Sequence, residues 1–214
     1  MRWGQTVVGL IVLVATAWGC LALWFQLPRH FTALGLIVLG VWGLLGAISA
    51  FTLLWCYQAR YRRSLLGAYM LSAALLLVWW YNISPSHQRD WADDVANLLQ
   101  AEIQGDQVTL HNVRNFDWRT ETDYTPNWET RSYDLNQLVS ADLVLSYWMG
   151  PHIAHTLVSF GFADDQQLVF SLEIRKERHE SFSAIGGFFR QFEQVLIAAD
   201  ERDLIRTRSN ARGE

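Results

Sequence analysis

The sequence predicts a membrane protein in which three transmembrane α-helices are followed by an α+β domain with a mainly antiparallel sheet. Two observations lead to this fold class. No Asp or Glu precedes Asp90, and that part of the chain holds three long stretches that are almost free of charge. All twenty-one acidic residues follow from Asp90 onward, where apolar residues alternate or gather in short runs. One part of the chain therefore suits lipid and the other suits water.

Each of the three uncharged stretches is long enough to cross a bilayer. A helix rises about 1.5 Å per residue, so roughly 20 apolar residues span a hydrocarbon core of about 30 Å. The apolar residues surround each predicted helix instead of forming one stripe, which argues against buried helices of a soluble protein. We therefore expect transmembrane helices at about 5–26, 33–56 and 65–83, which together form a membrane domain over 1–83.

The distribution of Arg predicts how these helices are oriented. Arg2 precedes the first helix, and Arg60, Arg62 and Arg63 separate the second from the third, whereas only Arg29 lies in the other connection. Loops rich in Arg and Lys stay in the cytoplasm. We therefore expect a cytoplasmic N-terminus. The chain from residue 84 onward is then on the far side, which for a bacterial inner membrane is the periplasm.

Small residues in the second predicted helix indicate close helix packing. The pairs Gly43/Ala47 and Gly46/Ala50 have the spacing that lets two helix backbones approach each other. Packing among the three predicted helices explains this pattern more simply than a dimer interface, although the oligomeric state stays open. The middle of each predicted helix has no ionisable side chain, which argues against a channel or a pump.

The aqueous part, 84–214, is acidic and lacks cysteine. It holds twelve Lys and Arg against twenty-one Asp and Glu, which disfavours nucleic acid and anionic lipid surfaces as partners. Both cysteines, Cys20 and Cys56, lie in predicted membrane helices. The aqueous part therefore has neither a disulfide nor a thiol nucleophile of its own.

The spacing of apolar residues predicts short helices and strands in the aqueous part. Strands are expected at 108–116, 143–148, 153–162, 168–176 and 195–199, with a short strand and turn over 131–139. Helices are expected at 91–104 and at 183–193, the second with Ser183 as its N-cap and Phe188, Phe189 and Phe192 on its inner side. A turn is expected over 200–203.

The predicted hairpin 153–176 carries the residues of greatest chemical interest. His155, Leu157 and Ser159 share one face of the first strand, and the opposite face, which includes Thr156, is expected to be core. A tight turn at 163–166 would put Glu173 opposite Thr156, and a slip of one residue would bring it level with His155 or Leu157. A carboxylate beside an imidazole orients the ring and fixes its tautomer. His155 and Glu173 are therefore the candidate catalytic residues.

Other interpretations of these residues stay open. A histidine on a half-buried strand is usually a packing residue, and Glu173, Arg175, Glu177 and Arg178 could form an ordinary sheet face with ion pairs. Several residues in this region have the side chains of metal ligands: His152, His155, Glu173, Glu177 and His179. His152 and His155 are three apart on an extended segment, so they point to opposite faces, and no known metal-binding spacing is present.

We therefore expect neither a metal nor another cofactor. Ser159 lacks the Gly-x-Ser-x-Gly pattern of a serine nucleophile. The candidate supporting residues are His152, Ser159, Arg175 and Glu177.

Several spaced motifs carry a family resemblance. They are Pro151-His152-Ile153-Ala154-His155-Thr156, Ser159-Phe160, Ser171-x-Glu173-x-Arg175-x-Glu177, Gly187-Phe188-Phe189-Arg190-Gln191-x-x-Glu193, Asp200-Glu201-Arg202-Asp203 and Arg206-x-Arg208, with Arg114-Asn115-Phe116 and Asp142-Leu143 before them. In this order they resemble the Lnb N-terminal periplasmic domain family over about residues 88–214.

This resemblance implies a circularly permuted papain-like fold and an activity like that of a bacterial lipoprotein N-acyltransferase. Such an enzyme moves an acyl chain from the lipid of a lipoprotein to its N-terminal cysteine. The resemblance makes His155 the general base and Glu173, or a nearby polar group, its orienting partner, with a cysteine thiolate as nucleophile. The implied partners are the lipid bilayer and a lipoprotein or other acyl substrate.

The family pattern includes an Asn-Cys motif that the sequence lacks. We therefore expect the periplasmic domain, 84–214, to be truncated at its C-terminal end and to lack covalent catalysis on its own. One alternative is a non-catalytic, membrane-anchored binding or assembly module. A further alternative is a metal-dependent hydrolase.

Overall fold

The computed structural model describes residues 2–27, 32–55, 60–120, 122–147 and 150–209. The chain divides into two compact units. The helical unit comprises Met1–His87 and Phe182–Gln191, and the sheet unit comprises Gln88–Ser181 and Phe192–Glu214. Arg29, Cys56 and Trp148, on which parts of the sequence interpretation rest, lie outside the described residues.

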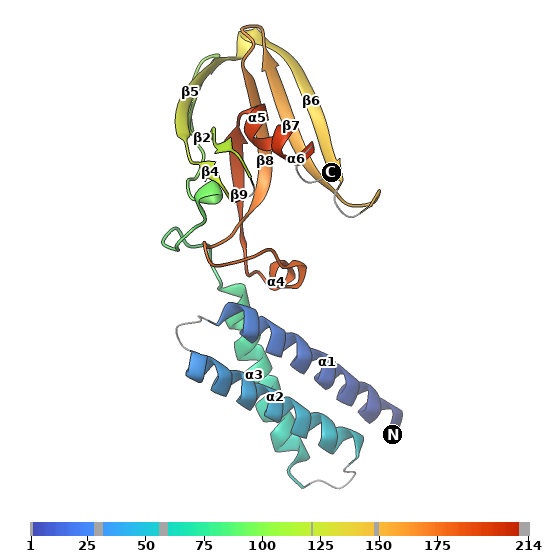
Figure 1. The fold of residues 1–214 in the computed structure, drawn as a ribbon. Helices are drawn as coiled ribbons and strands as arrows, with labels where there is room; N and C mark the ends of the chain where they lie inside the picture. The colour runs from blue at the N-terminus through green and yellow to red at the C-terminus, as the bar shows by residue number, and fades with distance from the viewer. Residues whose placement is uncertain (1, 28–31, 56–59, 121, 148–149, 210–214) are drawn as a thin grey trace. The chain divides into compact units, whose positions relative to one another are not determined.

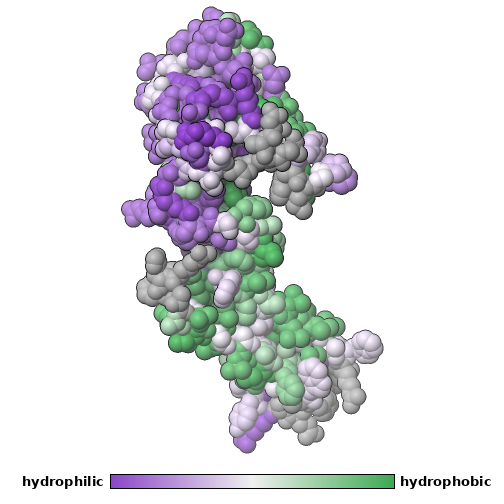
Figure 2. Space-filling view, in the orientation of Figure 1, coloured by the Kyte–Doolittle hydropathy of each residue, from purple (hydrophilic) through white to green (hydrophobic). Residues whose placement is uncertain are grey.

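Three long helices make up most of the helical unit: α1 (Arg2–Gln26), α2 (Thr32–Leu54) and α3 (Arg62–Tyr81). By length and composition, all three are able to cross a membrane. Figure 2 shows that hydrophobic residues cover most of their visible surface. Three apolar helices followed by a mixed sheet domain confirm the predicted fold class.

Small residues let α1 and α2 pack closely, and the two helices lie side by side in Figure 1. A Cβ atom added at Gly46 would collide with the side chain of Thr16. Thr16 is itself held in place, because its hydroxyl donates to the carbonyl of Val12 and its carbonyl accepts from Trp42 Nε1 at 3.0 Å. Ala50 is almost fully buried. Gly46 and Ala50 therefore serve contacts within the helical unit.

The helical unit also contains a short segment from late in the sequence. Its helix α4 (Ala184–Phe188) begins as predicted, since Ser183 caps it by accepting a hydrogen bond from the amide of Gly186. The helix is shorter than the predicted 183–193 because two glycines weaken it and Arg190 adopts a left-handed conformation, with φ at 57°. Phe189 is buried as expected, whereas Phe188 is exposed.

A seven-stranded sheet forms the sheet unit (Figure 1). Its strands are β1 (Gln100–Gln104), β2 (Gln107–Arg114), β5 (Trp128–Asp134), β6 (Leu138–Tyr147), β7 (Ala154–Phe162), β8 (Gln167–Arg175) and β9 (Glu193–Ala199). The order is β1-β2-β9-β8-β7-β6, and β5 also pairs with β2. All pairs are antiparallel except β2 with β9, which is parallel.

The remaining elements of the sheet unit are short. The strands β3 (Asp117–Trp118) and β4 (Tyr124–Thr125) form a separate two-stranded sheet. The 3-10 helices are η2 (Asp93–Val95) and η3 (Leu135–Gln137), and the last α-helices are α5 (Glu201–Leu204) and α6 (Arg206–Ser209). The turn expected at 200–203 is thus the start of a helix, with the Asp200 side chain accepting from the Arg202 amide as its N-cap.

The prediction of a helix at 91–104 is wrong. Residues 93–95 form a single 3-10 turn, and β1 then pairs along its length with β2 through a tight turn at Gly105. The apolar spacing had a different cause: Ala92 and Val95 are buried against the sheet at this single 3-10 turn. Pairing with β2 stabilises 100–104 as a strand, which overrides the local helical pattern.

The most buried positions of β7 lie on the face that carries His155. Leu157 and Ser159 are almost fully buried, whereas Thr156, on the face expected to be core, is exposed. On the His155 face, one buried cluster contains five sheet residues, Leu157, Val169, Val195, Ile197 and Ala199. Three residues from outside the sheet pack against them: Ala92, Val95 and Leu204. Phe162 belongs to a second buried cluster with Leu110, Val113, Tyr133, Leu168 and Ala198. Both sheet faces therefore contribute to core packing.

Candidate functional site

The register of β7 and β8 decides which residue faces His155. Leu157 pairs with Ser171, and this register continued by two residues puts Glu173 opposite His155. The expectation that Glu173 lies opposite Thr156 is therefore wrong by one residue. The turn has three residues, with Asp165 in the left-handed region at φ 64°, and the amide of Phe162 donates to the carbonyl of Gln166. One residue fewer in the turn moves the pairing by one position.

Four side chains meet at this end of the hairpin, and we call them the His155 cluster: His155, Ser171, Glu173 and Arg208. His155 Nε2 lies 2.7 Å from Ser171 Oγ and 3.3 Å from Glu173 Oε1. The Ser171 hydroxyl donates to Glu173 Oε1 at 2.7 Å. Arg208 Nη2 donates to the same oxygen at 2.6 Å. The structure thus brings the two predicted residues, His155 and Glu173, into direct contact.

The hydrogen bonds of the cluster fix the tautomer of His155. A serine hydroxyl has one hydrogen, and that of Ser171 is donated to Glu173. Ser171 Oγ must therefore accept from His155, which puts the ring hydrogen of the neutral imidazole on Nε2. The lone pair is then on Nδ1, which has no hydrogen-bond partner among the residues that the structure describes. An imidazole held in this way can take up a proton at Nδ1.

Glu173 is ionised at neutral pH despite being only about 16% exposed. Burial alone would raise the pKa of its carboxyl group. The hydrogen bond from His155, the charge of Arg208 and the hydrogen bond from Ser171 outweigh burial and lower the pKa to about 2. A fixed negative charge beside Nε2 stabilises the imidazolium that forms when Nδ1 takes up a proton.

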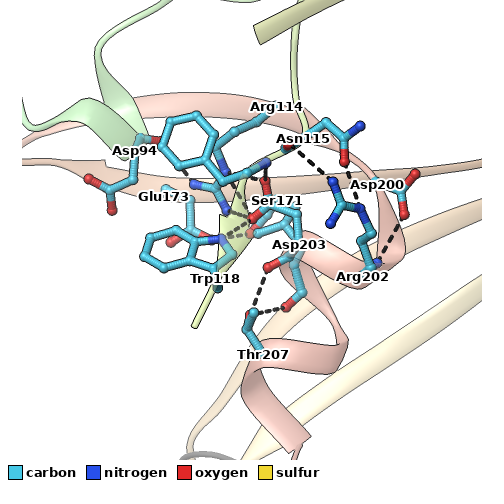
Figure 3. A network of polar contacts seen from close by, with 12 residues as sticks. Asp94, Arg114, Asn115, Trp118, Ser171, Glu173, Asp200, Arg202, Asp203 and Thr207 are labelled. Carbon is cyan, nitrogen blue, oxygen red and sulfur yellow. Dashed lines mark hydrogen bonds and ion pairs between the residues drawn. The ribbon is translucent and has the colours of Figure 1, made fainter. Parts of the chain in front are cut away.

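Arg208 reaches the cluster from the end of the described chain, where a buried network holds the short helices. Figure 3 shows Asp203 at the centre of this network. Its carboxylate accepts from Arg114 Nε at 3.0 Å, from Trp118 Nε1 at 2.8 Å and from the amide of Phe116 at 2.9 Å. The carbonyl of Asp203 accepts from Thr207, one residue before Arg208. These bonds tie α5 and α6 to β2 and hold Arg208 in place.

Three of the candidate supporting residues have partners outside the cluster. Ser159 donates to Glu201 Oε1 at 2.8 Å and is almost fully buried. Arg175 donates to the carbonyls of Val95 and Ala96, and its guanidinium lies 4.3 Å from the ring centre of Trp91. Glu177 lies 3.7 Å from Arg89. These contacts are structural, since they join the sheet to the segment before β1 or to α5.

The fourth, His152, lies exposed in the turn before β7 and is not a member of the His155 cluster. His179 lies 3.8 Å from Glu177, again away from His155. In the described ranges, no group of three His, Cys, Asp or Glu side chains is arranged to hold a metal ion. Of the five ligand-type residues of the sequence, His155 lies beside Glu173, Glu177 lies beside His179, and His152 belongs to neither pair.

Sequence reasoning missed two members of the cluster. Ser171 carries a usable signal, because residues two apart on a strand share a face and Ser171 precedes Glu173 by two. Arg208 has no such spacing signal, although it belongs to the motif Arg206-x-Arg208 that carries the family resemblance. It is distant from the hairpin in sequence, and only the packing of α5 and α6 against the sheet brings it to Glu173.

Comparison with known proteins gives a match to a protein family. Residues 124–214 match the family model of the Lnb N-terminal periplasmic domain. This match confirms the family resemblance for that part of the chain, which contains all four residues of the His155 cluster. No curated protein and no solved structure matches the chain.

Proposed function

We propose that the chain is a bacterial inner-membrane protein whose periplasmic domain, 84–214, takes part in acyl transfer from a lipoprotein or another acyl substrate near the membrane. His155 acts as general base through Nδ1, and Glu173 with Ser171 orients the ring. The observation that carries this proposal is the hydrogen-bonded row from Arg208 through Glu173 and Ser171 to His155 Nε2. In that row, Nε2 of the imidazole has a hydrogen-bond partner, and Nδ1 stays available for proton transfer.

The reaction requires a cysteine thiol as co-reactant, which residues 84–214 do not contain. A second polypeptide segment supplies it. Nδ1 takes the thiol proton, and the thiolate sulfur attacks the acyl carbonyl carbon. The C–O bond to the leaving alcohol breaks, the alcohol takes the proton from the imidazolium, and a thioester remains. An amine then attacks the thioester, which gives the amide and restores the thiol.

Attachment to the membrane suits a substrate that carries an acyl chain. Three membrane helices confine the domain to the bilayer surface, which raises its effective concentration toward lipid-bound substrates. The Arg cluster between α2 and α3 supports a cytoplasmic N-terminus and a periplasmic sheet unit. The description of the matched family as a periplasmic domain supports the same orientation.

One observation favours a second candidate function, a non-catalytic binding or assembly module. Arg208 and Ser171 both bond to Glu173 Oε1, so the cluster can also be a structural link between β8 and α6. In that case His155 is a packing residue and its substitution changes stability without changing a reaction rate.

A thiolysis assay separates the two functions. The full chain in lipid nanodiscs is mixed with N-acetylcysteine as thiol and a p-nitrophenyl acyl ester, and release of p-nitrophenol is followed. We expect a rate above the lipid background by on the order of tenfold, because a positioned base raises the thiolate fraction at the site. His155→Gln should abolish this excess, and Glu173→Gln should reduce it and change its pH profile.

The matched control is Ser159→Ala, which alters a buried polar residue of the same strand face outside the cluster. Its rate should equal that of the unaltered chain. Equal rates for the unaltered chain and His155→Gln, with both folded by circular dichroism, would exclude the base and leave the binding module.

A further inference from the structure

The loop between β8 and β9 exposes three large apolar side chains in one short segment. Phe182 is 57% exposed, Ile185 60% and Phe188 74%. They flank and form part of α4, which belongs to the helical unit. Large apolar side chains that gather on a surface mark an interaction site.

Phe189 and Arg190 attach this segment to the ends of α1 and α3. The ring of Phe189 stacks on Phe25 with 5.8 Å between centroids and meets Trp80 edge-on at 6.4 Å. Gln26 Nε2 donates to the carbonyl of Phe189 at 2.7 Å. Arg190 Nη1 donates to the carbonyl of Trp80 at 2.9 Å, and its guanidinium lies 4.7 Å from the Trp80 ring centre. The segment is therefore fixed to the last turns of two membrane helices.

The local backbone keeps the three apolar side chains outward. The side-chain amide of Gln191 lies where a Cβ atom at Gly186 would be, so the segment after α4 packs closely against this glycine. Arg190 then adopts a left-handed backbone conformation, which ends this segment shortly before β9 in the sequence. While Phe189 fills the contact with α1 and α3, Phe188 beside it points away from that contact.

We propose that Phe182, Ile185 and Phe188 insert into the lipid at the bilayer interface, on the side of the membrane where α1 ends and α3 ends. These three side chains would contact lipid at the boundary between the headgroups and the acyl chains. The proposal follows from continuity, because the segment packs directly on the ends of two helices that are long and apolar enough to cross a membrane. Aromatic side chains with polar neighbours favour that depth, and Arg190 and Gln26 supply the polar neighbours.

The inference is independent of the proposed acyl transfer, and it adds a contact between lipid and the loop that joins two strands of the sheet. Such a loop is a fourth attachment to the bilayer besides the three described helices.

The test measures how deep residues 185 and 188 lie in the bilayer. Phe188→Cys and Ile185→Cys are made separately in a Cys20→Ala, Cys56→Ala background and labelled with the fluorophore NBD in the full chain. Each is reconstituted in phosphatidylcholine nanodiscs that hold one copy. Asp164→Cys, in the exposed turn between β7 and β8, is the matched control. Both substituted apolar side chains are exposed, so we expect the variants to fold.

We expect lipids with a nitroxide at acyl carbon 5 to quench the label at 188 and 185 at least threefold more than at 164. Quenching by these lipids should also exceed quenching by headgroup nitroxide lipids. Quenching equal to that at 164, or stronger from the headgroup, would overturn the insertion. An emission shift seen only in liposomes with many copies, and not in single-copy nanodiscs, would assign the surface to a second copy of the chain instead.

Discussion

At the residue scale, two carboxylates show how local context decides what a charge does. Asp203 is fully buried, and its carboxylate accepts hydrogen bonds from four donor groups: Nε and Nη2 of Arg114, the amide of Phe116 and Nε1 of Trp118, so it serves as an anchor for α5. Glu173 shares one oxygen among His155, Ser171 and Arg208 at the edge of the buried region. Only Glu173 is placed to influence the protonation of an imidazole that retains access to other molecules.

The low pKa of Glu173 makes the stability of the hairpin depend on acid. The folded carboxyl has a pKa of about 2 against an ordinary 4.5, so its charge stabilises the folded state at pH above about 4.5. This contribution is lost as the pH falls from about 4.5 toward 2, and it amounts to about 3 kcal/mol at most. We expect Glu173→Gln to speed hydrogen exchange of β7 and β8 at pH 6, with the difference from the unaltered chain shrinking toward pH 3.

The matched control is Asp142→Asn, which removes an exposed carboxylate from the neighbouring strand β6. It should leave exchange in β7 and β8 unchanged at both pH values. A difference for Glu173→Gln that stays constant from pH 6 to pH 3 would show that packing, and not charge, explains the effect.

At the element scale, the sequence predicted some elements well and others poorly, for physical reasons. The hairpin of β7 and β8 was predictable because both strands alternate and are joined by a short polar turn, but its register was not. One residue in the turn decides which side chain faces His155, and only the left-handed Asp165 reveals it. The prediction of an α-helix at 91–104 failed because Ala92 and Val95 are buried with helical spacing, yet they lie at a single 3-10 turn and not in an α-helix.

The contact of α1 with α2 supplies a prediction at the same scale. Gly46→Ala forces a methyl group into Thr16, whose side chain is fixed by its bonds to Val12 and Tyr69. We expect the helical unit to lose about 1–3 kcal/mol, as overpacked cores do. The measurement is unfolding of the full chain from mild detergent by titration with sodium dodecyl sulfate, followed by circular dichroism.

Gly40→Ala is the matched control, since a Cβ atom there meets nothing within 4 Å. Its unfolding should coincide with that of the unaltered chain. If both alanine variants unfold at the same detergent fraction, close packing at Gly46 does not stabilise the bundle.

At the scale of the whole molecule, charge distribution was the most informative property of the sequence. The absence of Asp and Glu before Asp90 separated membrane helices from the sheet unit without any structural data. It did not predict that the segment Phe182–Gln191 joins the helical unit. That association rests on ring stacking and on backbone carbonyls as acceptors, and neither leaves a pattern in the sequence.

The proposed orientation has a direct test in bacterial cells. Alkaline phosphatase, which folds only in the periplasm, should be active when fused behind Gln88 and inactive when fused behind Arg63. Green fluorescent protein, which fluoresces when made in the cytoplasm, should show the reverse. Active phosphatase behind Arg63 together with inactive phosphatase behind Gln88 would invert the topology and remove the acyl-transfer site from the periplasm.

The position of β9 in the strand order has a consequence for export. Among the described strands, β9 joins the group β1, β2 and β5 to the group β6, β7 and β8, yet it is the last strand to be synthesised. Until 193–199 emerges from the translocation channel, the two groups are separate half-sheets with unpaired edges. Completion of this sheet therefore waits for 193–199, and a pause in secretion before that point leaves a species that chaperones and proteases can bind.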